Sequence, residues 1–270
     1  MRDHAWRWIC GLFVAAAIMT PWTASAQVPQ GKHYVLVHGA WHGAWAWYKV
    51  ETQLEHAGHA VTNVDLPAHG IDGTDPGTVT LGDYAQAVVD RIDAIDGQVI
   101  LVGHSMGGVV LSAVAEARPD KIEKLVYVAA FLLPDGVSLF DVAIEDPGSL
   151  VTPNLIVDPV HGTADFNRAF LRQMFYGTSP EADVTLATAL VRPNPLLPIA
   201  TPLSLTPQNF GSVRRFYVTT LQDRAISPPV QEMMYTQMGV EKVYSMNTDH
   251  SPFFSKPTQL SHILLDIGSW

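Results

Sequence analysis

Short and nearly continuous apolar runs recur along the chain and alternate with stretches that have helical periodicity. Such runs are typical of parallel strands, because these strands are buried on both faces of a sheet. Six runs are expected to be strands, at residues 34–37, 61–64, 99–102, 125–129, 215–219 and 242–246. The pattern predicts an α/β protein with a mostly parallel sheet of about six strands flanked by helices.

Helices are predicted between these runs, where apolar residues recur at the spacing of one helical face. Tyr84, Val88, Ile92 and Ile95 have this spacing. Helices are expected at residues 48–56, 81–95, 106–117, 229–238 and 258–267. Each of them lies next to a predicted strand, as in a chain of β–α units.

One long segment, about residues 134–211, breaks this alternation. It is rich in proline and contains two stretches with helical character, at 165–175 and 181–191. Long inserted segments in compact domains are usually functional or disordered, and the apolar content of this one argues against disorder. The segment is interpreted as a helical lid insertion over the functional site.

The first 26 residues have the three-part layout of a secretory signal peptide. Arg2 and Arg7 supply positive charge, an apolar run extends from Trp8 to Met19, and small residues lead up to Ala26. We expect cleavage after Ala26, which leaves one domain at residues 27–270 that is exported, either periplasmic or secreted. The alternative is a retained membrane anchor.

Charge and cysteine content narrow the range of partners and chemistries. Removing the signal takes away two of 16 basic and one of 26 acidic residues, which changes the formal charge from −10 to −11. Such an acidic chain repels phosphate backbones and anionic lipid, so neither nucleic acid nor a membrane is an expected partner. Cys10 is the only cysteine, so the mature chain has no thiolate nucleophile. The sequence does not indicate an oligomeric state.

A Gly-x-Ser-x-Gly motif, at residues 103–107, stands between a predicted buried strand and a predicted helix. In this context the motif is typical of a nucleophilic serine on a sharp strand-to-helix turn. The turn exposes the Ser105 hydroxyl, and the flanking glycines allow close packing. The non-catalytic alternative is a serine helix cap followed by a glycine-rich packing contact.

A serine nucleophile needs a base and an orienting carboxylate, which are expected to follow it in the order acid, then histidine. His250 comes directly after the last predicted strand, and Asp223 comes after the strand before it. The sequence therefore predicts a triad of Ser105, Asp223 and His250. Asp135 is the alternative acid, while Asp249 is too close to His250 in sequence to orient it.

Two backbone amides are expected to bind the negatively charged oxygen of the reaction. One belongs to Met106, directly after the nucleophile, and the other to Ala40, in the turn after the first strand. Trp41, His104 and Phe131 are expected to contact the substrate. Other residues are expected to wall an apolar pocket or, alternatively, to belong to the core: Phe140, Phe170, Met174, Phe175 and Phe210.

Several segments together resemble the plant methyl esterases and hydroxynitrile lyases of the α/β-hydrolase fold. They lie at residues 33–45 (HYVLVHGAWHGAW), 65–70 (DLPAHG), 103–108 (GHSMGG), 130–135 (AFLLPD), 189–193 (ALVRP) and 249–251 (DHS). The resemblance implies the α/β-hydrolase fold and hydrolysis of small or aromatic carboxylic esters, without a metal or cofactor. Bacterial relatives include secreted esterases that act on xenobiotic esters such as pyrethroids.

Departures from the family pattern limit what the resemblance implies. Hydroxynitrile lyases have Thr at the position of Gly39 and Lys at that of Ser251, so lyase chemistry is not expected. Epoxide hydrolases and haloalkane dehalogenases need an aspartate where Ser105 stands. The expected function is a serine carboxylesterase with a small-molecule ester substrate. A lactone, amide or carbon–carbon bond hydrolase remains an alternative, as does a non-catalytic ligand-binding protein.

Overall fold

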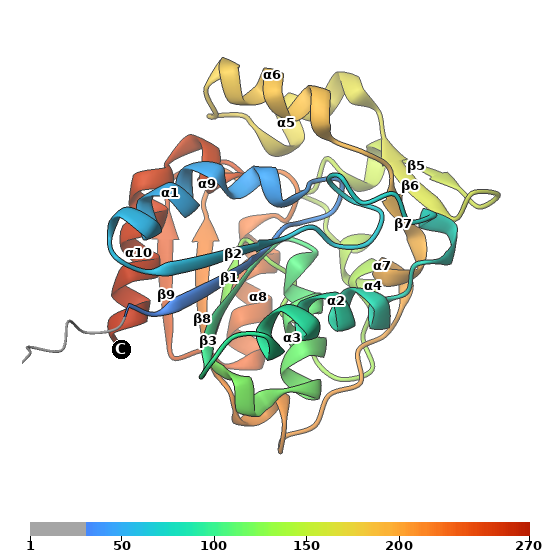
Figure 1. Ribbon diagram of the computed structural model, residues 1–270. Coiled ribbons are helices and arrows are strands. Elements are labelled where there is room, and N and C mark those ends of the chain that lie inside the picture. Colours follow the sequence, from blue (N-terminus) through green and yellow to red (C-terminus); the bar gives the residue numbers. More distant parts are fainter. Residues whose placement is uncertain (1–30) are drawn as a thin grey trace, which may run out of the picture. The chain divides into compact units, whose positions relative to one another are not determined.

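The computed structural model describes residues 31–270, in which a six-stranded parallel sheet carries helices on both faces (Figure 1). The strands follow the spatial order β2-β1-β3-β4-β8-β9. They are β1 His33–Val37, β2 Ala60–Val64, β3 Val99–His104, β4 Ile122–Val128, β8 Arg214–Thr220 and β9 Lys242–Met246. Each predicted apolar run overlaps one of these strands, and every neighbouring pair is parallel, so the predicted sheet is confirmed.

Strand β4 begins three residues before the predicted run. The prediction starts late because the first residues of the strand include the charged Glu123 and Lys124. Lys124 is buried, and its Nζ donates to the carbonyl of Gly268 at 3.1 Å and pairs with Glu123 at 3.1 Å. These partners allow a lysine to occupy a buried strand position. A search for apolar runs therefore places the start of this strand too late.

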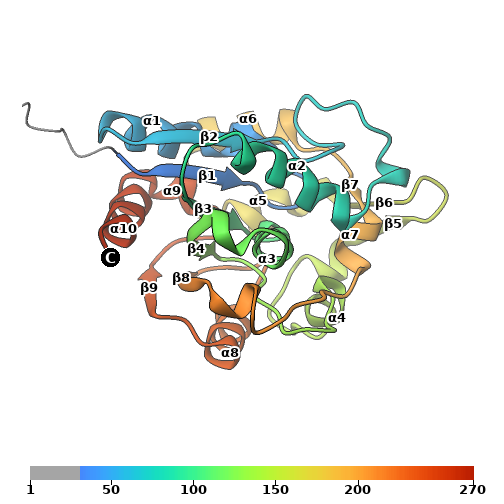
Figure 2. The ribbon, with the colours of Figure 1, turned by 60° about the horizontal axis from the view of Figure 1, so that its bottom comes forward.

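The helices cover both faces of the sheet (Figure 2). Figure 2 shows α1 and α10 on one side and α3 and α8 on the other, and α2 packs beside α3. The helices outside the insertion are α1 Tyr48–His56, α2 Leu81–Asp93, α3 Gly107–Ala117, α8 Pro228–Met238, α9 Pro252–Ser255 and α10 Pro257–Ser269. All five predicted helices are present, with ends that differ by at most two residues.

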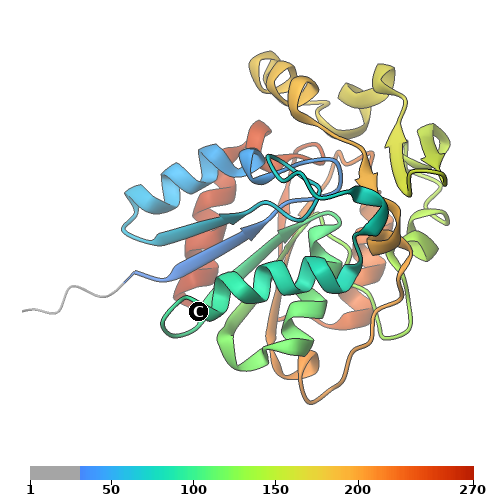
Figure 3. The same cartoon turned by 45° about the vertical axis from the view of Figure 1, so that its right-hand side comes forward.

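The segment between β4 and β8 folds over the carboxyl ends of the strands (Figure 3). It contains short helices and a second, three-stranded antiparallel sheet in the order β5-β6-β7. Its elements are α4 Leu139–Ala143, β5 Leu155–Asp158, β6 Thr163–Phe166, α5 Leu171–Phe175, α6 Glu181–Leu190, β7 Asn194–Pro195 and α7 Leu196–Ala200.

The prediction of one of the two helices in this segment is partly wrong. Residues 165–175 were expected to be helical, but Asp165 and Phe166 end strand β6, and α5 begins only at Leu171. Strand β6 exists because it pairs with both β5 and β7, and β7 lies about 30 residues further along. Helical periodicity within one stretch cannot reveal such a partner.

The predicted signal peptide at residues 1–26 lies outside the described residues. Within residues 31–270, no helix combines the length and the hydropathy that crossing a bilayer requires.

Candidate active site

Ser105 occupies the sharp turn between β3 and α3, with a backbone φ of +53°. This left-handed conformation is costly for a residue with a Cβ, so the surrounding packing must hold it. A Cβ on Gly103 would lie 2.9 Å from the carbonyl oxygen of Gly107, and one on Gly107 would lie 2.9 Å from that of His38. Glycine at both positions lets the strands and the helix approach closely enough to enforce the turn.

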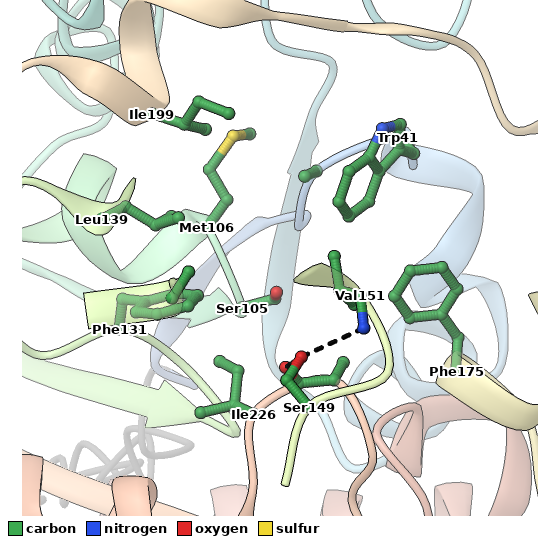
Figure 4. Close-up of a pocket in the computed structure, with 13 residues that line it drawn as sticks. Trp41, Ser105, Met106, Phe131, Leu139, Ser149, Val151, Phe175, Ile199 and Ile226 are labelled. Carbon is green, nitrogen blue, oxygen red and sulfur yellow. Dashed lines mark hydrogen bonds between the residues drawn. The ribbon is translucent and has the colours of Figure 1, made fainter. Parts of the chain in front are cut away.

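Hydrogen bonds hold the backbone of Ser105 on both sides. Its amide donates to the carbonyl of Val128 at 3.3 Å. Its carbonyl accepts from the amides of Gly108 at 3.0 Å and Phe131 at 3.1 Å. The hydroxyl lies at the edge of a cavity, as Figure 4 shows. The nucleophile candidate is therefore presented by a fixed backbone.

Asp223 lies in the turn after β8, and both of its carboxylate oxygens are held. Oδ1 accepts from the amides of Ala225 at 2.7 Å and Ile226 at 2.9 Å. Oδ2 accepts from Oγ1 of Thr220 at 2.8 Å and Nε2 of Gln231 at 2.9 Å. These donors fix the direction in which the carboxylate points.

His250 follows β9, and its Nδ1 donates to Oδ2 of Asp223 at 2.7 Å. Both side chains are buried, with 1% and 0% of their surface exposed. A hydrogen on Nδ1 leaves Nε2 as the nitrogen that can accept a proton. The ring centroid lies 5.8 Å from that of Phe175, which lines the same cavity as Ser105.

The structure brings Asp223 and His250 into direct contact, but the last link of the predicted triad is open. Among the hydrogen bonds of residues 31–270, none joins the Ser105 hydroxyl to His250. In unliganded enzymes such a bond is often long and shortens when substrate binds. The proposed proton transfer therefore requires the Ser105 hydroxyl and the His250 ring to come within hydrogen-bond distance.

The two other aspartates considered as acids are engaged elsewhere. Oδ1 of Asp135 accepts from the amide of Leu205 at 2.8 Å. Oδ2 of Asp249 accepts from the amide of Thr178 at 2.8 Å and the hydroxyl of Ser179 at 2.9 Å. Neither carboxylate bonds the ring of His250, so Asp223 is the acid that this geometry supports.

Two backbone amides beside Ser105 are available for a negatively charged oxygen. Within residues 31–270 the amides of Ala40 and Met106 donate no hydrogen bond, and both residues line the cavity. His38 orients the first of them, because its Nδ1 donates to the carbonyl of Gly39 at 2.8 Å. The peptide is trans, so the N–H of Ala40 points away from that carbonyl.

Four other buried imidazoles surround this turn and are neutral at pH 7. Burial lowers the pKa of His38, His69 and His104, and it lowers that of His42 to about 4. Nε2 of His38 accepts from the amide of Leu66 at 3.1 Å, which requires an unprotonated nitrogen. The neutral form therefore fits the two hydrogen bonds of the His38 ring.

The Ser105 hydroxyl opens onto a cavity of about 50 Å³ whose wall is almost entirely apolar. A space of this size holds only a few water molecules. The wall consists of Ala40, Trp41, Ser105, Met106, Phe131, Leu139, Ala143, Ser149, Val151, Phe175, Ile199, Ala225 and Ile226.

Three of the aromatic residues expected at the pocket stand in this wall, namely Trp41, Phe131 and Phe175. His104 does not line this cavity. Its ring packs 4.4 Å from that of His250, and its Nε2 bonds the His250 carbonyl at 2.8 Å, so it supports the base from behind. Four other expected wall residues also lie outside the lining: Phe140, Phe170, Met174 and Phe210.

Sequence reasoning missed most of the remaining wall. Leu139, Ala143, Ser149, Val151 and Ile199 come from the insertion, where no motif marks them. Two further wall residues, at positions 225 and 226, follow Asp223 in the same turn, and that proximity is the one signal that could have indicated them. Among residues 31–270, no group of three histidine, cysteine or acidic side chains is arranged to hold a metal ion.

Comparisons with known sequences show which proteins this chain is similar to. Residues 34–262 match the model of the Alpha/beta hydrolase family. Methylesterase 7 of Arabidopsis thaliana is 38% identical over 255 residues, which cover 88% of this chain and 96% of that protein. Putative methylesterase 14, chloroplastic, of the same plant is 39% identical over 268 residues, covering 92% and 77%.

Solved structures with the same fold include an esterase and a pyrethroid hydrolase. The crystal structure of polyneuridine aldehyde esterase matches with a TM-score of 0.80 and 32% identity, covering 88% of this chain and 99% of that one. A pyrethroid hydrolase from Sphingobium faniae JZ-2 matches with a TM-score of 0.80 and 26% identity, covering 88% and 97%.

Proposed function

Because this chain belongs to the alpha/beta hydrolase family and is a carboxylic ester hydrolase related to plant methylesterases, we propose that it cleaves small apolar esters through an acyl-enzyme on Ser105. One observation supports this proposal above all. The buried hydrogen bond between Asp223 and His250 stands beside a strained serine that faces an apolar cavity. These are the parts that acyl transfer to serine requires.

In the first half of the proposed reaction, the Ser105 oxygen attacks the ester carbonyl and its proton passes to Nε2 of His250. Asp223 stabilises the resulting imidazolium through the bond to Nδ1. The former carbonyl oxygen becomes negative and accepts hydrogen bonds from the amides of Ala40 and Met106. His250 then protonates the departing alkoxide, and the alcohol leaves.

In the second half, a water molecule attacks the acyl group on Ser105. His250 takes a proton from this water, and the same two amides stabilise the second tetrahedral intermediate. Collapse returns the proton to the serine oxygen and releases the carboxylic acid. Each residue therefore acts twice, and no further catalytic group is needed.

The cavity wall favours substrates that carry no charged group near the carbonyl that reacts. None of its 13 side chains is acidic or basic, so a charged group there would lose its hydration without gaining a partner. The relatives are named as methylesterases, an aldehyde esterase and a pyrethroid hydrolase. For this chain we propose esters of apolar acids with methanol or another small alcohol.

Hydrolysis of p-nitrophenyl acetate tests the proposal. The purified protein should release p-nitrophenol well above the uncatalysed rate, whereas Ser105→Ala should lose nearly all of this activity. Ser112→Ala is a matched control, because Ser112 is a buried serine of α3 that does not line the cavity. Ser105→Ala protein that keeps the activity of Ser112→Ala would refute the proposed function.

We also propose that the chain is exported, because its first 26 residues have the layout of a signal peptide. When the full sequence is expressed in a Gram-negative bacterium, the protein should be recovered from the periplasm with the mass of a chain that begins at Gln27. A protein without residues 1–26 should stay in the cytoplasm. Recovery of the uncleaved chain from the cytoplasm would contradict export.

A further inference from the structure

We propose that His42 is a positioning residue that ties the oxyanion hole to the insertion, so that the Ala40 amide is fully ordered only while Tyr176 is in place. This role rests on the proposed esterase function. It concerns a side chain that touches neither the substrate nor the three predicted triad residues. His42 lies three residues beyond Gly39, on the far side of the strained turn.

The imidazole of His42 bonds two groups that come from distant parts of the chain. Its Nδ1 lies 2.7 Å from the carbonyl oxygen of Ala40, and its Nε2 lies 2.6 Å from the hydroxyl of Tyr176. Tyr176 directly follows α5 in the insertion, and it is 134 residues away in sequence. His42 and Tyr176 are 2% and 0% exposed, so water does not replace either bond.

The hydrogen bonds fix the direction of each donor. A carbonyl oxygen can only accept, so Nδ1 of His42 carries the hydrogen and donates it to Ala40. In a neutral ring Nε2 then has no hydrogen and accepts that of the Tyr176 hydroxyl. The lowered pKa of His42 agrees with this neutral ring. The insertion therefore bonds to His42, and His42 in turn bonds to the residue whose amide forms the oxyanion hole.

The turn held in this way does not keep its shape unaided. Trp41, which follows Ala40, has a φ of +64°, a conformation that side chains with a Cβ rarely adopt. Such backbone persists only where its surroundings determine it. The Ala40 carbonyl bonds His42, and the peptide groups that carry this carbonyl and the Ala40 amide meet at one Cα, so the bond to His42 restrains the residue whose amide is needed.

The other bonds to this turn also come largely from the insertion. The amide of Arg192 donates to the carbonyl of Trp41 at 3.0 Å, and the Trp41 indole donates to the carbonyl of Ala164 at 2.9 Å. The Trp41 amide donates to Oδ1 of Asn194 at 3.4 Å. Figure 1 shows this segment above the ends of the strands, where a shift would pull on all of these bonds together.

His38 limits the size of the expected effect. It holds the carbonyl of Gly39 from the core side, and the backbone amide of His42 donates to the same carbonyl at 3.3 Å. The peptide that carries the Ala40 amide therefore keeps two supports when the His42 side chain is replaced. Removing an oxyanion donor outright lowers kcat by roughly 10²–10³-fold. Loosening one donor should cost less, about tenfold, and should affect kcat more than KM because the bond to the oxyanion forms in the transition state.

Two matched tyrosine variants test the proposal with p-nitrophenyl acetate. Tyr176→Phe removes the hydroxyl that bonds His42, and Tyr34→Phe removes an equally buried hydroxyl that bonds the Leu264 carbonyl at 3.0 Å, away from the site. We expect kcat to fall about tenfold in Tyr176→Phe, with KM within twofold. Tyr34→Phe should keep both constants. Equal kcat in the two variants would overturn the proposal.

A second measurement separates positioning from a general loss of structure. Phenylboronic acid forms a tetrahedral adduct with an active-site serine and places an oxygen in the oxyanion hole. Its inhibition constant should rise about tenfold in Tyr176→Phe, and thermal unfolding should shift no more than in Tyr34→Phe. An unchanged inhibition constant, or a fall in affinity matched by Tyr34→Phe, would contradict the role given to His42.

A double-mutant cycle tests whether Tyr176 and His42 act on the oxyanion hole through the hydrogen bond between them. His42→Leu should lower kcat at least as much as Tyr176→Phe, and adding Tyr176→Phe to it should cost nothing more. Additive losses would overturn the proposal. A wild-type protein without esterase activity would instead refute the proposed function. An active wild type with an unaffected Tyr176→Phe would refute only the role of His42.

Discussion

Gly39 passes so close to Ser105 that a Cβ on the glycine would lie 2.8 Å from the Cβ of the serine. The two turns meet because they follow β1 and β3, which are neighbours in the sheet. Their contact sets the distance between the Ala40 amide and the nucleophile. A side chain at this position would require the two turns to separate.

Gly39→Ala should therefore lower kcat for p-nitrophenyl acetate by at least tenfold. Its methyl group would also meet Nδ1 of His104 at 2.8 Å, so both the nucleophile and the support of His250 would be displaced. Gly73→Ala is the control, because a Cβ there meets no atom within 4 Å. Steady-state kinetics of both variants measures the change in kcat. An unchanged kcat in Gly39→Ala would show that the close contact between Gly39 and Ser105 is not needed for activity.

Asp223→Asn should lower kcat by about 10³- to 10⁴-fold, because an amide cannot both accept from Nδ1 of His250 and stabilise the imidazolium. Circular dichroism should show that the variant remains folded. Asp135→Asn should keep its activity, since that carboxylate bonds only the amide of Leu205 among residues 31–270. The reverse result would transfer the role of the acid to Asp135.

Stability should fall on acidification because buried imidazoles are neutral in the folded protein. The pKa of His42 is about 4, below that of histidine in an unfolded chain, so the unfolded state binds more protons between these values. His42 alone should reduce the free energy of unfolding by about 2 kcal/mol between pH 7 and pH 5. The loss should begin near pH 6.5 and level off below pH 4.

Urea unfolding across this pH range measures the effect. His42→Leu should make this dependence shallower than in the wild-type protein. If stability does not change from pH 7 to pH 5, the imidazole at position 42 is not held in its neutral form by burial.

Leu139→Ala should widen the cavity and change the preferred acyl length. The ratio of kcat/KM for p-nitrophenyl butyrate to that for the acetate should rise several-fold, because the larger acyl group gains the space of the lost side chain. Leu171→Ala is the matched control, since Leu171 is buried in the same insertion but does not line the cavity. A similar ratio in both variants would exclude Leu139 from substrate selection.

The sequence alone predicts the sheet and the family and indicates a candidate triad, because each of these leaves a local signal in the chain. The strands are apolar runs, and relatives confirm the α/β-hydrolase fold that the motifs imply. Ser105, Asp223 and His250 each follow a strand directly, so their order along the chain indicated that they would converge. The structure adds the hydrogen bond between the last two.

The cavity wall could not be predicted in the same way. Leu139, Ser149 and Ile199 reach the site through an insertion that is organised by the small β5-β6-β7 sheet, whose pairing leaves no periodic signal. His104 is the neighbour of the nucleophile in sequence, but its ring lies outside the cavity lining and packs against that of His250. The link between His42 and Tyr176 depends on residues that only the fold brings together.

Covalent labelling tests the central claim most directly. The protein is treated with diethyl p-nitrophenyl phosphate, digested and analysed by mass spectrometry, while residual esterase activity is measured in parallel. We expect one diethylphosphoryl group per chain, located on Ser105, and a loss of activity in proportion to labelling. Full activity after complete labelling of Ser105, or inactivation with the label on another residue, would contradict the claim that this serine is the nucleophile.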